Sequence, residues 1–244
     1  MTTSGTTAFN MPFTDIAEEA WERAGRELRS GYDLQTARRS MNLMTIEWQN
    51  RGINMWTIEQ GVLDLVQGQA TYALPDDTID LLEQSIRTGA NNSVTQSDLN
   101  LNRISISTYS SIPNKITQSR PIQVVIHRDS GQTYPTSSTL GATATSTATT
   151  ITLSGVAGLP PAGFIKIGSE IINYGYIEGN VLQNCFRGQQ GTTAATHTIG
   201  GIAIPVYWEQ VPSVTVWPVP DNVQSYQIVY WRMRRVQDAG GGIE

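Results

Sequence analysis

The sequence has 244 residues, of which 39% are hydrophobic, and a formal net charge of −5 from 16 Lys and Arg against 21 Asp and Glu. This length and apolar content are sufficient for packed domains, while the net negative charge argues against a surface that binds a phosphate backbone. A single cysteine, Cys185, excludes an internal disulfide and any metal site that needs two or more thiolates.

Two further features of the composition narrow the class of protein. No run approaches the roughly 18 consecutive apolar residues of a membrane span, and residues 1–13 lack the basic and apolar regions of a signal peptide. We therefore expect synthesis in the cytoplasm and no association with a membrane. Charged residues make up only 15% of the chain, below the usual quarter or so, which is typical of a subunit whose surface is largely covered by neighbours.

Two segments near the N-terminus, residues 14–28 and 34–52, repeat apolar residues at three- and four-residue spacing. The first set is Ile16, Ala17, Ala20, Ala24 and Leu28. The second set is Leu34, Ala37, Met41, Met44 and Trp48. We predict two amphipathic helices within residues 14–52 that pair antiparallel, the first capped by Thr14 or Asp15 and the second ended by Gly52.

From residue 54 onward the pattern becomes that of strands and tight turns, which predicts a β-region over residues 54–135 and 206–236. Its expected elements are strands at 79–86, 122–127, 214–218 and 226–233, a polar loop at 89–99 and a short helix within 103–112.

Residues 136–205 differ from both flanks, because apolar runs there alternate with glycine turns and charged residues are few. The charged residues are Lys166, Glu170, Glu178 and Arg187. We predict a small all-β module, residues 136–205, inserted into an adaptor domain made of residues 1–135 and 206–244. The predicted fold class is α+β: an N-terminal helical bundle, a β-sheet or β-barrel-like domain, and the inserted module.

The histidines, the cysteine and the acidic pairs do not form a pattern typical of a catalytic or metal site. His127 and His197 have no carboxylate or cysteine at ligand spacing, and Cys185 on a probable strand is best interpreted as a small core residue. The acidic pairs at 18–19 and 76–77 are interpreted as surface charge, and the glycines of RGQQG (187–191) as a turn. We therefore predict no catalytic, metal or cofactor site, and a protein that is not an enzyme.

Basic and aromatic residues suggest contacts instead. Arg232, Arg234 and Arg235 form a basic cluster, either a solvated strand edge or a contact with an acidic patch of a neighbour. Six tryptophans are numerous for so uncharged a chain, and Trp48 and Trp56 fit a core or an interface equally well.

Several motifs occur in the order found in one family. These are DIAEEAWERAGRE (15–27), QTARRSMNLMTIEWQNRGINMWTIEQG (35–61), QGQATYALPDDTIDLL (67–82), RISISTYSSIPNK (103–115), RPIQVVIHRD (120–129), PSVTVWPVPD (212–221) and YQIVYWRMRRVQD (226–238). The chain thereby resembles the head-to-tail adaptor (head-completion, tail tubular) proteins of short-tailed bacteriophages. Residues 167–200 are similar to a small β-module found in many phage structural proteins.

The resemblance implies a structural virion protein at the head–tail junction, assembled in the host cytoplasm as a ring of about twelve copies. Its partners would be other copies of itself, the portal protein and the tail nozzle or tube protein, with genomic DNA passing through the lumen without specific binding. Members of the family continue into a C-terminal helical segment that helps to dock the ring, whereas this sequence ends at Glu244.

The helices are expected to pack side by side between subunits. The residues expected to form inter-subunit ion pairs are Glu18, Glu22, Arg26, Arg38 and Arg39. Two other classes stay open: a tail-spike, fibre-associated or glycan-binding β-protein, suggested by the Trp-, Tyr- and Thr-rich β content, and a peptidoglycan hydrolase carried in the tail. The two N-terminal helices argue against the first, and the lack of a catalytic residue set argues against the second.

Overall fold

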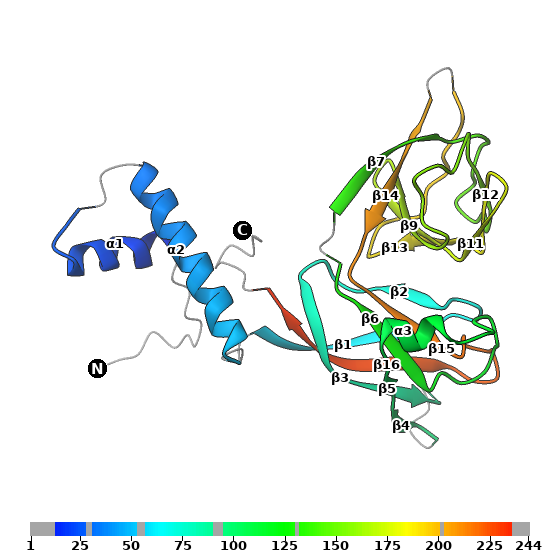
Figure 1. The fold of residues 1–244 in the computed structure, drawn as a ribbon, viewed down its shortest axis with the longest axis horizontal. Coiled ribbons are helices and arrows are strands. Elements are labelled where there is room, and N and C mark those ends of the chain that lie inside the picture. The colour runs from blue at the N-terminus through cyan, green and yellow to red at the C-terminus, as the bar shows by residue number, and fades with distance from the viewer. Residues whose placement is uncertain are drawn as a thin grey trace, which may run out of the picture. The chain divides into compact units, whose positions relative to one another are not determined.

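The computed structural model describes residues 13–27, 31–52, 57–89, 95–129, 132–200 and 203–235. The chain is mixed α+β with strands predominating (Figure 1). It divides into two compact units, one formed by Met1–Glu59 with Met233–Glu244 and the other by Gln60–Arg232. We call these the helical unit and the β unit and describe each by itself.

The helical unit contains α1 (Phe13–Arg23) and α2 (Gly31–Asn50). The two predicted helices are confirmed, but α1 ends before residue 28. Gly25 adopts a left-handed conformation with φ 71°, while its N–H donates to the carbonyl of Glu22 (2.9 Å) and that of Arg26 to the carbonyl of Trp21 (2.9 Å). This pair of bonds is the Schellman termination that glycine favours. Two helices are described here, so a helical bundle is not confirmed.

The first pair of sheets in the β unit packs face to face. One has the order β1-β16-β3-β4, with β1 (Ile58–Asp64), β16 (Tyr226–Arg234), β3 (Thr78–Thr88) and β4 (Ser97–Asn100). The other has the order β2-β15-β6-β5, with β2 (Thr71–Ala73), β15 (Ser213–Trp217), β6 (Gln123–His127) and β5 (Asn102–Arg103), and the short α3 (Ile106–Ser110) follows β5.

Along β16, every second residue from Tyr226 to Tyr230 points into the core between these two sheets. Along β16, Tyr226, Ile228 and Tyr230 are buried in one cluster with Leu81 of β3 and Val216 of β15. Most of the predicted strands lie near their expected positions in the structure. The predicted helix within 103–112 corresponds to α3.

The predicted polar loop at 89–99 is partly wrong, because its end belongs to β4. Asp98 of β4 lies opposite Arg87 of β3, and its two carboxylate oxygens accept bonds of 2.8 Å from that guanidinium. Such a bidentate cross-strand pair favours strand pairing even where few residues are apolar.

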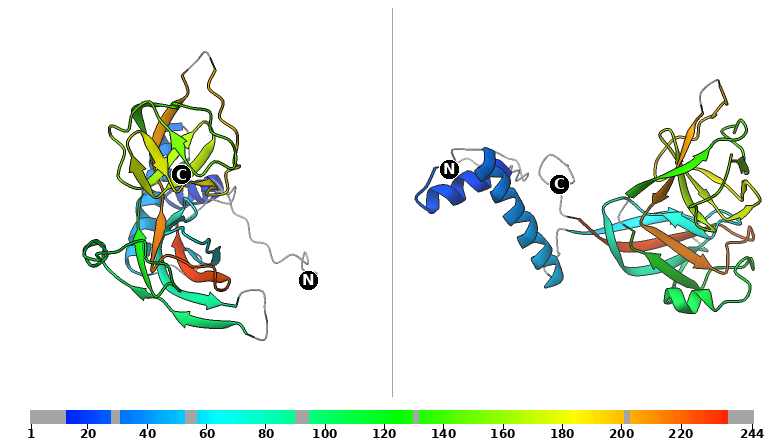
Figure 2. Two further views of the ribbon diagram at one scale, coloured as in Figure 1. Left: turned by 90° about the vertical axis from the view of Figure 1, so that its right-hand side faces the viewer. Right: turned by 45° about the horizontal axis from the view of Figure 1, so that its top comes forward.

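The second pair of sheets has the orders β13-β10-β9-β14-β7 and β11-β12-β8 (Figures 1 and 2). The strands are β13 (Phe186–Gln189), β10 (Glu170–Tyr174), β9 (Gly163–Ile167), β14 (Pro205–Gln210), β7 (Gln132–Thr139), β11 (Tyr176–Glu178), β12 (Val181–Gln183) and β8 (Ile151–Thr152). Their core is separate from the first and includes Ile165, Ile172, Tyr174, Leu182 and Cys185.

The chain enters and leaves this second pair of sheets through β7 and β14, which are antiparallel neighbours with Gln132 opposite Gln210. Both strands thus extend in sequence past the predicted limits of the inserted module, residues 136–205. All four sheets are open, each with two edge strands, so the barrel-like closure that we expected is absent from the part of the chain that is described. The domain boundary at 136–205 stays a prediction.

Candidate interaction surfaces

One face of α2 is exposed and carries three large apolar side chains. Tyr32, Arg39, Leu43 and Ile46 follow one another at spacings of seven, four and three residues, which places them on a single face of a helix. The side chains of Tyr32, Leu43 and Ile46 are 76%, 62% and 53% exposed. We call these four residues the outer stripe.

The opposite face of α2 carries the apolar repeat found in the sequence. Leu34, Ala37, Met41 and Met44 are each half-buried there. The helix therefore has apolar side chains on two opposite faces, and among the described residues those of only one face are partly buried. Within α1 and α2, as far as they are described, Ala17 is the one buried residue.

The predicted charged contacts of the helices lie at the surface. Glu18 and Glu22 are exposed on α1, Arg26 is exposed after its end, and Arg38 and Arg39 are exposed on α2. The Arg38 guanidinium lies 5.8 Å from the ring centroid of Phe13, within cation–π range. A neighbouring pair within α1, Arg23 and Glu19, forms a 2.7 Å ion pair between exposed side chains.

Of the two tryptophans singled out from the sequence, the structure describes the position of one. Trp48 is 36% exposed near the end of α2. Trp56 lies outside the described residues.

The basic cluster of β16 does not act as one surface. Arg232 is buried, and its Nη1 donates to Asp77 Oδ1 and, at 3.0 Å, to Thr78 Oγ1. An interface role for Arg232 and a surface role for Asp77 are therefore wrong, because each neutralises the other inside the β unit. The pairing could not be found by spacing, since 155 residues separate the partners.

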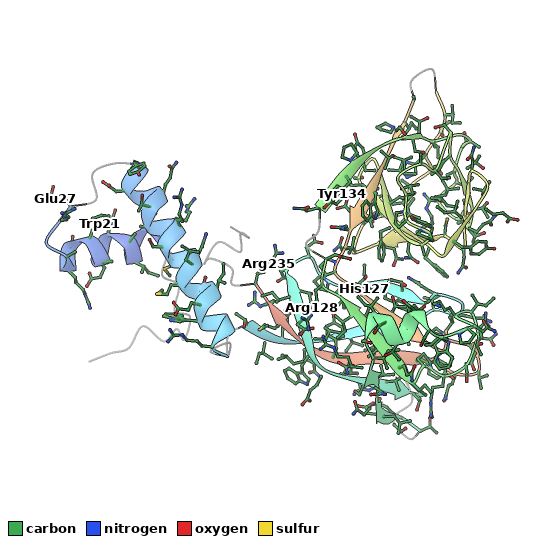
Figure 3. The ribbon with its side chains drawn as sticks, in the orientation of Figure 1. Trp21, Glu27, His127, Arg128, Tyr134 and Arg235 are labelled. Atoms are coloured by element: carbon green, nitrogen blue, oxygen red, sulfur yellow. The ribbon has the colours of Figure 1, made fainter. Side chains whose placement is uncertain are left out.

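The other two arginines of the cluster stay nearer to solvent. Arg234 Nε is 3.9 Å from Glu59 Oε2, and both side chains are partly exposed. Arg235 follows β16 and is exposed, as Figure 3 shows. These two remain candidates for contact with an acidic neighbour.

A shallow hollow of about 580 Å³ lies beside β3, β4 and β16. Leu82, Leu99 and Trp231 contribute to its lining and are 44%, 41% and 43% exposed. Its charged lining residues are Glu83, Asp98 and Arg103, of which Asp98 is paired with Arg87 and Arg103 with Asp80. We call this the sheet hollow. Sequence reasoning missed it, because the residues that form it are spread over four strands, β3, β4, β5 and β16.

A buried ionic cluster joins β10, β13 and residues 195–197. Glu170 is fully buried and accepts bonds from Arg187 Nε (2.8 Å) and Nη2 (2.7 Å), and from His197 Nε2 (2.8 Å). The backbone N–H groups of Gly188 and Ala195 also donate to it, at 3.1 Å each. Burial alone would raise the pKa of the Glu170 carboxyl, but these five donors outweigh it and lower the pKa to about 2.

His197 has no carboxylate at ligand spacing in the sequence, but in the structure its Nε2 lies 2.8 Å from Glu170 Oε2. All groups of this cluster are used for holding three segments together, so it is a structural cluster. Cys185 is confirmed as a buried core residue, and burial raises the pKa of its thiol to about 12. The RGQQG turn is confirmed in part: Arg187, Gly188 and Gln189 belong to β13, and Gln190 and Gly191 form the turn that follows it.

A second groove, of about 490 Å³, is lined by residues of both pairs of sheets, among them Tyr109, His127, Tyr176 and Trp208. His127 Nε2 lies 3.1 Å from Thr215 Oγ1, and burial lowers the pKa of this imidazole. Trp208 stacks against Tyr134 of the neighbouring strand, with 4.9 Å between ring centroids. The groove combines aromatic and polar walls, and its lining also includes the charged residues Lys115 and Glu209.

The described residues include no group of three or more His, Cys, Asp or Glu side chains that could hold a metal ion. Over the same residues, no helix is both long enough and apolar enough to span a membrane. Comparison of the chain with family models, with curated proteins and with solved structures found no match.

Proposed function

We propose that this chain is a structural subunit of a bacteriophage particle, an adaptor whose copies form a ring between the portal of the capsid and the tail. The observation that carries the proposal is the state of the helical unit: α2 exposes Tyr32, Leu43 and Ile46 on one face, while Ala17 is the one residue that its described helices bury. The order of the sequence motifs, which resembles that of the adaptor family, supports the same role.

The physical argument concerns helix stability. Helices of 11 and 20 residues, the lengths of α1 and α2, gain most of their stability from packing an amphipathic face against a partner. Exposed apolar side chains gathered on one face mark a site of protein–protein contact. The helical unit therefore suits a protein that completes its burial on assembly.

The charge of the chain suits a channel for DNA. With a net charge of −5, the subunit would repel phosphates on average, so the genome can pass through the ring without being held. We expect negligible affinity for duplex DNA at physiological salt, measured by gel shift or fluorescence anisotropy.

The decisive experiment mixes the full chain with purified portal rings and images the product by electron microscopy. The proposal predicts an added ring of density on the portal, and the chain should also be found in purified particles. Absence from particles, together with no binding to portals, would contradict the adaptor function.

Charge reversal tests the helix contacts within that assembly. Changing Arg38 and Arg39 together to Glu should reduce ring formation on portals, because both are exposed on α2. The matched control changes Arg120 and Arg128, which are exposed in the β unit, and alters the net charge equally. Equal loss in both double variants would point to net charge rather than to a contact of α2.

The groove with Tyr109, Tyr176 and Trp208 keeps a glycan-binding role as the second candidate, since aromatic rings beside polar groups suit sugars. A glycan array distinguishes the two: the adaptor function predicts no specific signal, and a signal abolished by Tyr176→Ala would favour the alternative.

A further inference from the structure

We infer that the outer stripe of α2 docks on the sheet hollow of a neighbouring copy of this chain, so that copies join head to tail. This contact rests on the proposed ring and specifies which two surfaces build it.

The helix side of the contact has one cation among apolar side chains. Arg39 lies between Tyr32 and Leu43 on the outer stripe, and no ion pair joins it to another described residue. Because the opposite face of α2 is already partly covered, the stripe is a second contact surface of the same helix. From Tyr32 to Ile46 it extends for about 21 Å at ~1.5 Å per residue.

The sheet side has the complementary composition. Trp231 alternates along β16 with the buried residues Tyr230 and Arg232, so its side chain points away from the core, and it lines the hollow with Leu82 and Leu99. Glu83 lies in the same lining, is exposed, and has no ion pair with any described side chain. An exposed tryptophan beside leucines is the kind of anchor that interfaces favour.

The charges decide between a symmetric and a head-to-tail contact. Placing one outer stripe on another would bring two Arg39 side chains together, and placing one hollow on another would do the same for two Glu83 side chains. Like charges that meet in an interface are unfavourable, whereas Arg39 of one copy and Glu83 of the next are attractive. Two different surfaces on each copy give a heterologous contact, which closes into a ring when the rotation between copies allows it.

A cross-linking experiment between two singly substituted full-length chains tests the contact directly. One carries Leu43→Cys and the other Leu82→Cys, and the control partner carries Val223→Cys, at a side chain that is 79% exposed and does not line the hollow. After mild oxidation we expect the 43–82 disulfide-linked dimer to exceed the 43–223 dimer about tenfold or more at equal protein concentration. Equal yields of the two dimers overturn the inference, as does a Leu43–Leu82 bond that forms only within one chain carrying both substitutions.

Charge reversal supplies the second readout. Arg39→Glu alone and Glu83→Arg alone should each weaken self-association about tenfold in sedimentation velocity over concentrations up to about 1 mM, and the double variant should recover it. A wild-type chain that stays monomeric over the whole range, or a double variant no better than either single one, overturns the docking.

Failure of this contact is distinguishable from failure of the proposed function. Rings that form on portals with wild-type, R39E and E83R chains alike would leave the adaptor in place and remove only the docking contact. Recovery of self-association in the double variant, in a chain that neither binds portals nor occurs in particles, would keep the contact and remove the adaptor.

Discussion

In the β unit, facing sheets bury Leu81, Ile172 and Tyr230 in two hydrophobic cores, and even Glu170 and Arg232 are buried with charged partners. In the helical unit, Ala17 is the one buried residue of the described helices, and Leu43 and Ile46 are largely exposed. The β unit thus buries its apolar cores within itself and leaves the sheet hollow exposed, whereas the described helices leave the outer stripe exposed. Substitutions in the β cores should accordingly change stability, and substitutions on the outer stripe should change assembly.

The largest expected effect in the β unit comes from its buried carboxylate. Glu170→Ala removes the acceptor of the Arg187 guanidinium, whose side chain is 7% exposed, and breaking such a buried pair costs about 3–5 kcal/mol. Chemical denaturation should show this loss in the free energy of unfolding. The control Glu178→Ala, at an exposed residue, should stay within about 0.5 kcal/mol; similar losses in both would mean that the cluster does not stabilise the sheets.

The next effect is the response of the same cluster to acid. A carboxyl with a folded-state pKa of about 2 and an ordinary value of 4.5 contributes stability above the ordinary value and loses it as the pH falls toward the folded one. Thermal unfolding followed from pH 6 to pH 2 should therefore show the melting temperature falling below about pH 5. Glu170→Gln should make this fall shallower, and an unchanged slope would assign the acid response to other carboxylates.

A smaller loss of stability is expected from a substitution at Gly61, where the aromatic ring of Tyr230 lies close to the backbone. An added Cβ at Gly61 of β1 would overlap the Tyr230 ring, and overpacking of this kind costs about 1–3 kcal/mol. Gly61→Ala should lower the free energy of unfolding by that amount. Gly155→Ala is the matched control, since a Cβ there meets no atom within 4 Å.

The smallest effect on stability should come from the helical unit. Leu43 is 62% exposed, so Leu43→Ser should change the free energy of unfolding by less than about 0.5 kcal/mol, against about 2–5 kcal/mol for Leu81→Ala in the β core. Ring formation on portals should nevertheless fall in the Leu43→Ser chain. A large loss of stability without loss of assembly would break the distinction between the two units.

Local sequence patterns carried most of what could be predicted of the fold. Three- and four-residue spacing identified α1 and α2, and short apolar runs bounded by turn residues identified β3, β6, β15 and β16. The early end of α1 was missed because the repeat at Ala24 and Leu28 outweighed the glycine between them, although Gly25 alone suffices to end a helix.

The buried ion pairs are the part of the structure that the sequence predicted least well. Asp77 and Arg232 meet across 155 residues, and neither residue has a local pattern that identifies the other. For Glu170 and Arg187 a signal did exist, since opposite charges in a nearly uncharged β segment are stable in a core only as a pair. Alternation along β16 likewise placed Arg232 on the same face as Tyr230, which proved to be the core face.

The chain passes between its two units twice, once within β1 and once at the end of β16, and these strands are hydrogen-bonded neighbours in one sheet. The helices are nevertheless joined covalently to the β unit through β1 alone, because the segment after β16 runs on to the C-terminus. A proteolytic nick at the end of β16 would leave this link intact, whereas a nick within β1 would cut it and leave the strand pairing with β16 as the connection.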